Sequence, residues 1–327
     1  MRDNAFVGVG TAEFRVRMAA DPASVPGARR FVTDGLLSWG LAALVDDATL
    51  CVSELAANAA LHSASTFMEI AMRPLEDAVR ISVEDDGRTP AEAVVPRAGF
   101  PDPDDDLDVL ALNDEPTTGR GLAIVSILAT EWGVEKTEGG KRIWADIPES
   151  SDEHGVRLPR TNTEETPDPL EGGLPGGWGL VRLEGCPVRL SLRQDQHLDE
   201  LVRELQLIAA DRDNPRSRVL AQELQGLLSG PAHARHTGRR IAQQAAAAGK
   251  EYIDVDMAMP REFSVEVQAL QAAVKAADAL CEEATLLTLA SSPELRALRA
   301  WMTEQIVHQL EDGAGPVSWN DWLARRN

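Results

Sequence analysis

The stretch SELAANAALHS, Ser53–Ser63, is rich in alanine and leucine but carries three polar side chains at four-residue intervals. Glu54, Asn58 and His62 would lie in one row along a helix, because residues four apart stack above one another. A carboxylate, an amide and an imidazole in line can hold a cation, orient a water molecule and accept a proton. The row alone is more typical of a solvated helix face. The apolar stripe beside it consists of Val45, Ala48, Val52, Leu55 and Ala59.

Two further motifs change how this row is interpreted. VEDDGRTP places Asp85 and Gly87 at the end of an expected strand, and TTGRGLAIV places two glycines at the start of an expected helix. Glycines at a helix N-terminus let the backbone approach a phosphate, and the unpaired N–H groups there favour an anion. Three such motifs in this order are far more specific than any one of them, and they indicate a nucleotide site.

Residues from about 11 to 147 resemble the ATP-binding domain shared by DNA gyrase, histidine kinases and bacterial anti-sigma factors. Within that superfamily they are most similar to the anti-sigma factor serine/threonine kinases. CVSELAANAALHS resembles the N box of that group, and GRGLAIVSILATEWGVEKTEGGKRIWADI resembles its last helix and hairpin. The resemblance implies an α/β sandwich of the Bergerat type, with a mixed, mainly antiparallel sheet. ATP would bind between the N-box helix and a lid.

The resemblance also implies a role for each matching residue. Glu54 would be the general base that activates a substrate hydroxyl, and Asn58 would ligate the Mg²⁺ that bridges the phosphates. Asp85 would accept a hydrogen bond from the adenine amino group, and Gly87 would let the base approach the backbone. His62 would close the N-box row. The other nucleotide-binding residues, at the end of the lid, would be Thr118, Gly119, Arg120, Gly121 and Leu122.

The sequence departs from the family pattern in three places. Arg88 to Pro90 follow Gly87, where the family usually has a second glycine. Lys141 to Ile143 occupy the last strand, where a small hydroxyl residue often stands near the adenine, so the water network around the base would be altered. The expected lid, Ala91 to Thr117, carries eight carboxylates and one arginine. Such a lid would repel a triphosphate unless Mg²⁺ or a basic partner offsets its charge, and a solvated loop is the simpler interpretation.

Composition divides the 327-residue chain into three parts. Residues 1–148 would form the ATP-binding domain, and residues 149–177, rich in Pro, Gly and acidic side chains, would form a flexible linker. Residues 178–327 predict a helical bundle of unknown role. Its signals are a short hairpin at Val181–Leu192 followed by apolar stripes with helical spacing.

Bulk charge narrows the range of partners. The formal net charge is −21, which disfavours nucleic acid and an anionic membrane surface, since both require basic patches. Three widely spaced cysteines without metal-ligand spacing indicate a reducing cytoplasm. The expected partner is an anti-sigma factor antagonist with a phosphorylatable serine, or a sigma factor, and a homodimer is a further expectation.

Two functions stay open at this point. The first is an anti-sigma-like regulator that binds ATP and phosphorylates a Ser or Thr of its partner. The second is a catalytically inactive, nucleotide-dependent binding module whose helical domain senses a ligand or partner. A histidine kinase or a mechanochemical ATPase fits less well. Few residues precede the ATP-binding domain, and the part that follows it is helical.

Overall fold

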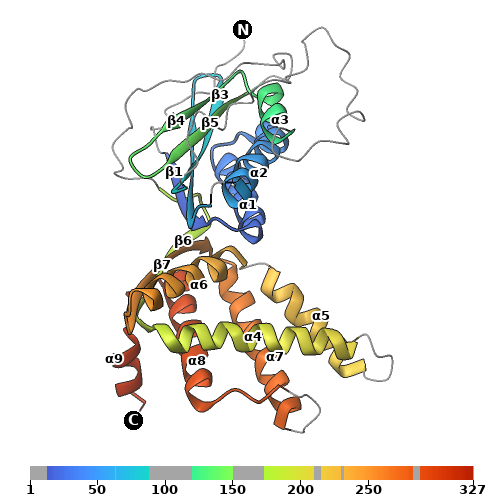
Figure 1. The fold of residues 1–327 in the computed structure, drawn as a ribbon, viewed down its shortest axis with the longest axis vertical. Coiled ribbons are helices and arrows are strands. Elements are labelled where there is room, and N and C mark those ends of the chain that lie inside the picture. Colours follow the sequence, from blue (N-terminus) through green and yellow to red (C-terminus); the bar gives the residue numbers. More distant parts are fainter. Residues whose placement is uncertain are drawn as a thin grey trace. The chain divides into compact units, whose positions relative to one another are not determined.

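The computed structural model describes residues 13–62, 64–87, 120–149, 173–209, 215–229, 232–282 and 288–326 (Figure 1). The chain divides into two compact units, Met1–Gly176 and Gly177–Asn327. Gly173 exchanges backbone hydrogen bonds with Glu13 and Arg15 of the first unit, at 2.8 and 3.1 Å. Most of the expected linker falls outside the described ranges, so its flexibility stays a prediction.

The first unit is an α/β layer structure, which confirms the predicted fold class. Its five-stranded sheet has the order β1-β2-β3-β5-β4, and all four pairings are antiparallel. Three helices cover one face of this sheet (Figure 1). The strands are β1 (Phe14–Ala19), β2 (Phe67–Pro74), β3 (Ala78–Asp85), β4 (Glu131–Lys136) and β5 (Lys141–Pro148). The helices are α1 (Val25–Ser38), α2 (Val45–His62) and α3 (Arg120–Leu128), with the short 3₁₀ turns η1 (Pro22–Ser24) and η2 (Ala42–Leu44).

Helix α2 lies against the sheet through the apolar stripe that its sequence predicts. Ala48, Val52, Leu55 and Ala59 are all buried, and they pack in the same core as sheet residues such as Ile81. This packing fixes the rotation of α2 about its axis. The neighbouring flank, which carries Glu54 and Asn58, is thereby held at the edge of the core rather than inside it.

The stretch GVEKTEGGKRIWADI predicts a hairpin with its turn at Glu138–Gly140, and the β4–β5 hairpin confirms it, but the helix predicted from GRGLAIVSILATEW is shorter than that pattern indicates. Helix α3 ends at Leu128, and the next strand begins at Glu131, within a segment that was expected to be helical. The reason is packing: Trp132 is fully buried and pairs with Ala145 across the hairpin. On the other side of β5, the register places Lys141 opposite Asp85.

The second unit is mainly helical, as predicted, but it also contains a two-stranded sheet. The expected hairpin at Val181–Leu192 is wrong. Residues Trp178–Pro187 form one continuous strand, β6, which pairs antiparallel with the distant β7 (Tyr252–Pro260). The helices are α4 (Val188–Ala209), α5 (Pro215–Ser229), α6 (Ala232–Ala247), α7 (Phe263–Glu282), α8 (Pro293–Glu311) and α9 (Trp319–Ala324).

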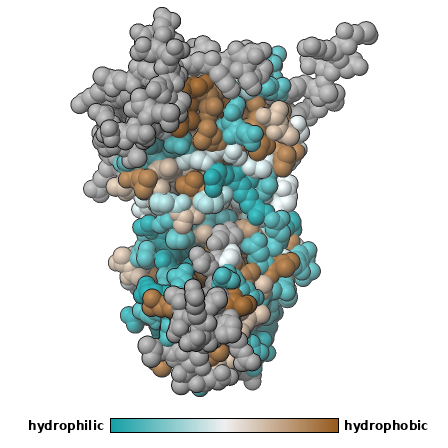
Figure 2. All heavy atoms as spheres, turned by 90° about the vertical axis from the view of Figure 1, so that its right-hand side faces the viewer, coloured by the Kyte–Doolittle hydropathy of each residue, from teal (hydrophilic) through white to brown (hydrophobic). Residues whose placement is uncertain are grey.

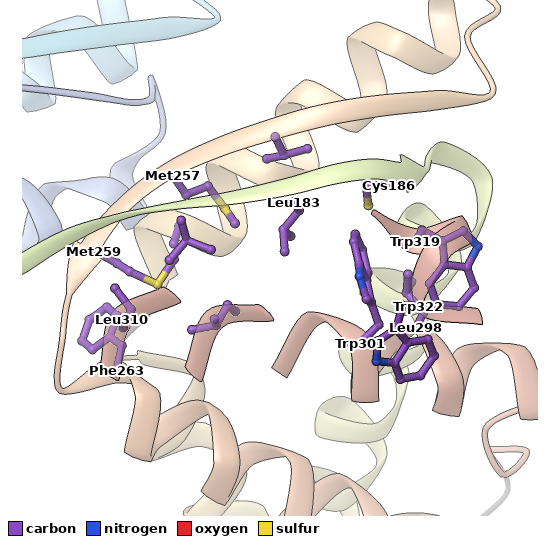
Figure 3. Packing of buried hydrophobic residues seen from close by; sticks show 14 residues of the cluster. Leu183, Cys186, Met257, Met259, Phe263, Leu298, Trp301, Leu310, Trp319 and Trp322 are labelled. Atoms are coloured by element: carbon purple, nitrogen blue, oxygen red, sulfur yellow. The ribbon is translucent and has the colours of Figure 1, made fainter. Parts of the chain in front are cut away.

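Two separate apolar clusters hold the second unit together. The sheet cluster joins β6 and β7 to α8 and α9 (Figure 3). Its C-terminal end is a group of tryptophans, in which the ring centroids of Trp301 and Trp319 lie 5.6 Å apart. The helix cluster joins α4, α5 and α7 through the stripes that the sequence predicts. Its buried members are Leu198, Leu201, Leu205, Leu220, Leu224, Ala273, Val274 and Ala277.

Exposed apolar side chains are spread over the surface of the chain. On the face drawn in Figure 2, hydrophobic residues stand in separate groups among hydrophilic ones. Single exposed residues such as Leu207 and Val265 are ordinary for a globular protein and do not identify a docking surface. Among the helices described, none combines the length and apolar character needed to cross a bilayer.

Gly140 offers a direct test of the sheet geometry. A Cβ atom at this position would lie 2.0 Å from the backbone oxygen of Asp85, a contact that neither backbone can relieve without moving. We therefore expect Gly140→Ala to destabilise the first unit by about 1–3 kcal/mol. Native-state hydrogen exchange of the β3 and β5 amides in the full chain would measure this loss.

Gly139→Ala is the matched control, because a Cβ there would have nothing within 4 Å. Its effect should stay within about 0.5 kcal/mol, as for most substitutions away from buried features. Equal protection factors for the two variants would contradict the close approach of Gly140 to Asp85.

Candidate nucleotide-binding site

The carboxylate of Asp85 is buried, with 3% of the residue exposed, at the end of β3. Its Oδ1 accepts hydrogen bonds from the Ser65 hydroxyl at 2.9 Å, the Gly87 backbone N–H at 3.0 Å and Lys141 Nζ at 3.1 Å. Its Oδ2 lies 2.9 Å from the same Nζ. A carboxylate offers about four acceptor positions, so these contacts occupy nearly all of them.

Lys141, at the start of β5, is almost as buried as its partner, with 4% exposed. Two features of the fold place its ammonium there. The β3–β5 register sets Lys141 opposite Asp85, and Gly140 lets the backbone of the hairpin press against the Asp85 carbonyl. A buried ammonium needs a partner, because removing it from water costs several kcal/mol. Asp85 supplies that partner.

The turn before β2 is fastened to the same corner by a second aspartate. Asp86 Oδ1 accepts hydrogen bonds from the backbone N–H groups of Thr66 at 2.7 Å and Phe67 at 3.1 Å. Together with the Ser65–Asp85 bond, these contacts tie the segment after α2 to the end of β3. Both aspartates of the VEDDG motif therefore accept hydrogen bonds from nearby backbone N–H groups and hold these segments in place.

Glu54 faces the first turn of α3. A Cβ atom on Gly121 would lie 2.7 Å from Glu54 Oε2, so only glycine allows this approach without displacing the carboxylate. The carboxylate is half-buried, and burial raises its pKa above the ordinary 4.5. A partly desolvated carboxylate beside the amino end of a helix is a suitable proton acceptor for a hydroxyl held there.

The next residue of the row, Asn58, carries an unsatisfied polar group. Its Nδ2 is buried and has no hydrogen-bond partner within the described parts of the chain. Buried polar atoms are normally paired, and Nδ2 is an N–H donor, so it marks a place where an acceptor such as a phosphate oxygen or a water completes the site. His62, one turn further on, is exposed at the end of α2.

The remaining predicted residues divide into those the structure places and those it does not. Leu122 is 2% exposed and its side chain belongs to the apolar core, so a contact with nucleotide would have to come from its backbone. Arg120 begins α3. Thr118, Gly119 and the predicted lid lie outside the described residues, as do Arg88 to Pro90.

Sequence reasoning missed three residues of this corner: Ser65, Gly140 and Lys141. Lys141 stood out as a departure from the family pattern, but its pairing with Asp85 depends on the strand register. Asp85 is the last residue of β3 and Lys141 is the first residue of β5, so antiparallel pairing of the two strands brings them together. This was the signal that could have suggested the pair. Ser65 and Gly140 lie in turns, where spacing carries little information about contacts.

The arrangement can be compared with what Mg²⁺-ATP requires. The phosphate side fits, since Glu54, the orphaned Asn58 amide and the amino end of α3 are brought together on one flank of α2. The part of the site expected to bind adenine fits less well, because the Asp85 carboxylate that would accept its hydrogen bond is already paired with Lys141. Within the described ranges, His, Cys, Asp and Glu side chains do not gather in threes that could hold a metal ion. Bound Mg²⁺ would therefore depend on Asn58 and on the phosphates.

Comparison with known families agrees with this geometry. Residues 18–147 match the family described as the histidine kinase-like ATPase domain. Domains of this family bind ATP, usually with Mg²⁺. The matched segment begins near the end of β1 and ends within β5, so it covers the other strands of the sheet and the three helices packed on it. No curated protein matches the chain.

The Asp85–Lys141 pair predicts a strongly non-additive mutant cycle. Lys141→Met should destabilise the first unit by about 3–5 kcal/mol, because it leaves a buried carboxylate without its cation. Asp85→Asn should also destabilise it. The double variant should recover much of the loss, since both charges are then gone. Hydrogen exchange of β3 and β5 in the full chain would measure all three.

Lys136→Met is the control for this cycle, because Lys136 is an exposed lysine on β4 that lies directly opposite Lys141. Its substitution should change stability by less than about 0.5 kcal/mol. Strictly additive effects of Asp85→Asn and Lys141→Met would show that the two side chains do not interact.

Proposed function

We propose that this chain is an ATP-binding regulatory protein resembling anti-sigma factors, which binds and phosphorylates a Ser or Thr of an antagonist and so controls sigma-factor-dependent transcription. The observation that carries the proposal is the contact between Glu54 and the first turn of α3. It places a carboxylate with a raised pKa beside the predicted phosphate site. The match to an ATPase domain family supports the nucleotide part.

The proposed transfer assigns one task to each residue of the row. Glu54 would accept the proton of the partner's hydroxyl as that oxygen bonds to the terminal phosphorus of ATP, while the bond from this phosphorus to the bridging oxygen breaks and ADP leaves. Asn58 would hold the metal through its amide oxygen, and the amino end of α3 would face the phosphates. Bound Mg²⁺ would neutralise the charge of the phosphate oxygens. A base with a pKa raised toward neutrality accepts a proton more effectively than an ordinary carboxylate does.

A second function is favoured by one observation. Lys141 occupies Asp85, so an adenine amino group reaches that carboxylate only by displacing or sharing its bonds with a buried ammonium. This favours weak or gated nucleotide binding. The alternative is thus a catalytically inactive module that binds its partner in a nucleotide-dependent way, with the second unit sensing a ligand or partner.

The partner of either form is proposed from the resemblance alone. An anti-sigma factor antagonist or a sigma factor is the first choice, in the cytoplasm, and self-association into a homodimer is the second. Nucleic acid and membranes are disfavoured by the net charge of −21. Affinity capture with and without Mg²⁺-ATP would identify a partner whose binding depends on nucleotide.

Nucleotide binding can be tested through thermal stability. Mg²⁺-ATP should raise the melting temperature of the full chain, because a ligand that binds only the folded state stabilises it. The rise should be larger in Lys141→Met, where Asp85 lacks its cation and the adenine amino group can supply a donor. It should be smaller in Asn58→Ala, which removes the metal ligand.

Lys136→Met should behave like wild type in this assay. If millimolar Mg²⁺-ATP leaves both wild type and Lys141→Met unchanged, the nucleotide proposal fails. An ATP-induced rise that is smaller in Lys141→Met would instead make Lys141 a direct contact to the base.

Catalysis is tested by Glu54→Gln. Phosphate transfer to a captured antagonist should fall about 10²–10⁴-fold, while ATP affinity stays nearly unchanged. In wild type, the rate should rise with pH through a pKa that lies above 4.5, since the base must be deprotonated to act. In Glu54→Gln this rise should disappear. Radiolabelled transfer at several pH values would measure both effects.

Asp46→Asn provides the control, because Asp46 is an exposed carboxylate on the same helix. Its rate and pH profile should match wild type. If wild type transfers no phosphate to a partner that it binds, and Glu54→Gln binds that partner equally well, the inactive module is the correct function.

A further inference from the structure

A cavity that is partly open to solvent lies within the second unit, between its two apolar clusters. A domain of this size usually has one contiguous core, whereas here the sheet cluster and the helix cluster remain separate. The cavity has a volume of about 160 Å³. Leu183 and Met257 of the sheet cluster line one side, and Leu198 and Val274 of the helix cluster line another.

The size of this space indicates its capacity. Protein interiors are packed as densely as organic crystals, and empty spaces larger than a water molecule are few. A dry apolar cavity of about 150 Å³ is large enough to hold benzene. The cavity of the second unit therefore has room for a molecule built on a single six-membered ring.

The walls are apolar and adaptable. Three of the lining side chains are methionines, namely Met257, Met259 and Met302. Unbranched thioethers adjust their shape to an occupant and make favourable contacts with aromatic rings. Met257 and Met259 project from β7 toward the interior of the sheet cluster (Figure 3). This lining suits a hydrocarbon body.

The cations beside the cavity are already neutralised. Arg235 donates to Asp195 at 2.9 Å, and Arg239 donates to Asp199 at 2.6 Å. Arg299 donates to Asp278 at 3.0 Å. All three guanidinium groups that line the cavity thus have carboxylate partners, so they would not favour an anionic ligand.

One polar side chain of the lining lacks a partner. Gln271, on α7, has its Oε1 buried without a hydrogen bond to any described residue. The terminal torsion of glutamine is soft, so its amide can turn at little cost. A donor on an occupant of the cavity would satisfy this oxygen, and buried acceptors are normally satisfied.

We propose that this cavity is a binding site for a small, uncharged, largely hydrocarbon molecule that carries one hydrogen-bond donor, such as a hydroxyl on a six-membered ring. The apolar body occupies the space between the two clusters, and the donor bonds to Gln271. This site lies wholly within the second unit and does not depend on nucleotide binding in the first.

Methionine methyl groups provide a site-specific readout in the full chain. With [¹³C-methyl]methionine, titration with phenol should shift the signals of Met257, Met259 and Met302. The signals of Met18, Met68 and Met72, buried in the first unit, should not move. Toluene, which has the same shape but no donor, should bind about fivefold more weakly, the usual effect of one hydrogen bond.

Two variants separate the cavity from the hydrogen bond. Gly238→Leu adds a side chain into the cavity from α6, where a Cβ would lie 3.6 Å from Met257 Sδ. It should abolish the phenol shifts. Gly226→Leu, on a helical glycine of α5 with open space around its Cβ, should leave them intact. Gln271→Leu should make phenol and toluene equal in affinity.

The outcomes that would overturn the proposal are distinct. If phenol and toluene shift none of the three cavity methionines, or if Gly238→Leu binds phenol as wild type does, there is no such site. If phenol binds but Gln271→Leu keeps the full preference over toluene, the assignment of the donor contact to Gln271 is wrong.

Discussion

One buried carboxylate joins the separate segments of the candidate nucleotide-binding site. Asp85 binds Ser65 from the turn after α2, Gly87 from its own motif and Lys141 from the last strand pair. Each bond fastens a different part of the chain to the end of β3. Without Asp85, the ammonium of Lys141 would be buried with no carboxylate partner. The register that places Lys141 opposite residue 85 would then cost several kcal/mol more in free energy. The corner beside the N-box helix is therefore stabilised by hydrogen bonds and an ion pair as well as by apolar packing.

The same interaction constrains what the site can recognise. An aspartate that is free to accept a hydrogen bond selects a base with a donor at its edge. Nearly all acceptor positions of Asp85 are occupied by hydrogen bonds from other residues of the chain. One of its donors is the ammonium of Lys141, which also pairs with the Asp85 charge. With Asp85 as the acceptor for the adenine amino group, as the resemblance implies, the free energy of nucleotide binding would be linked to that of a buried ion pair. A change at Lys141 would alter stability and nucleotide affinity in opposite directions, which separates this arrangement from an ordinary adenine pocket.

The sequence allowed most of the first unit to be predicted, because its signals are local. The four-residue row and apolar stripe of α2, the alternating strands and the glycine turn of the hairpin each lie within one element. The Asp85–Lys141 pair could not be predicted in this way, since it joins residues 56 positions apart through a strand register. The pairing of β6 with β7 was not predicted for the same reason, since it also joins strands that are far apart in the sequence. Polar residues near Gly185 resemble a turn locally, yet the strand continues there through a bulge to meet a distant partner.

The two units use unpaired polar atoms in different ways. In the first, nearly all acceptor positions of Asp85 are used, and one of the unpaired buried atoms is the Asn58 amide nitrogen, on the flank where phosphate is expected. In the second, the arginines around the cavity are paired with carboxylates, and the unpaired buried atom on the cavity wall is Gln271 Oε1. Natural folds leave few buried polar groups unsatisfied, because each one costs about as much as a lost hydrogen bond. We therefore expect a ligand that pairs with Asn58 or with Gln271 to add stability that the described part of the chain does not provide by itself.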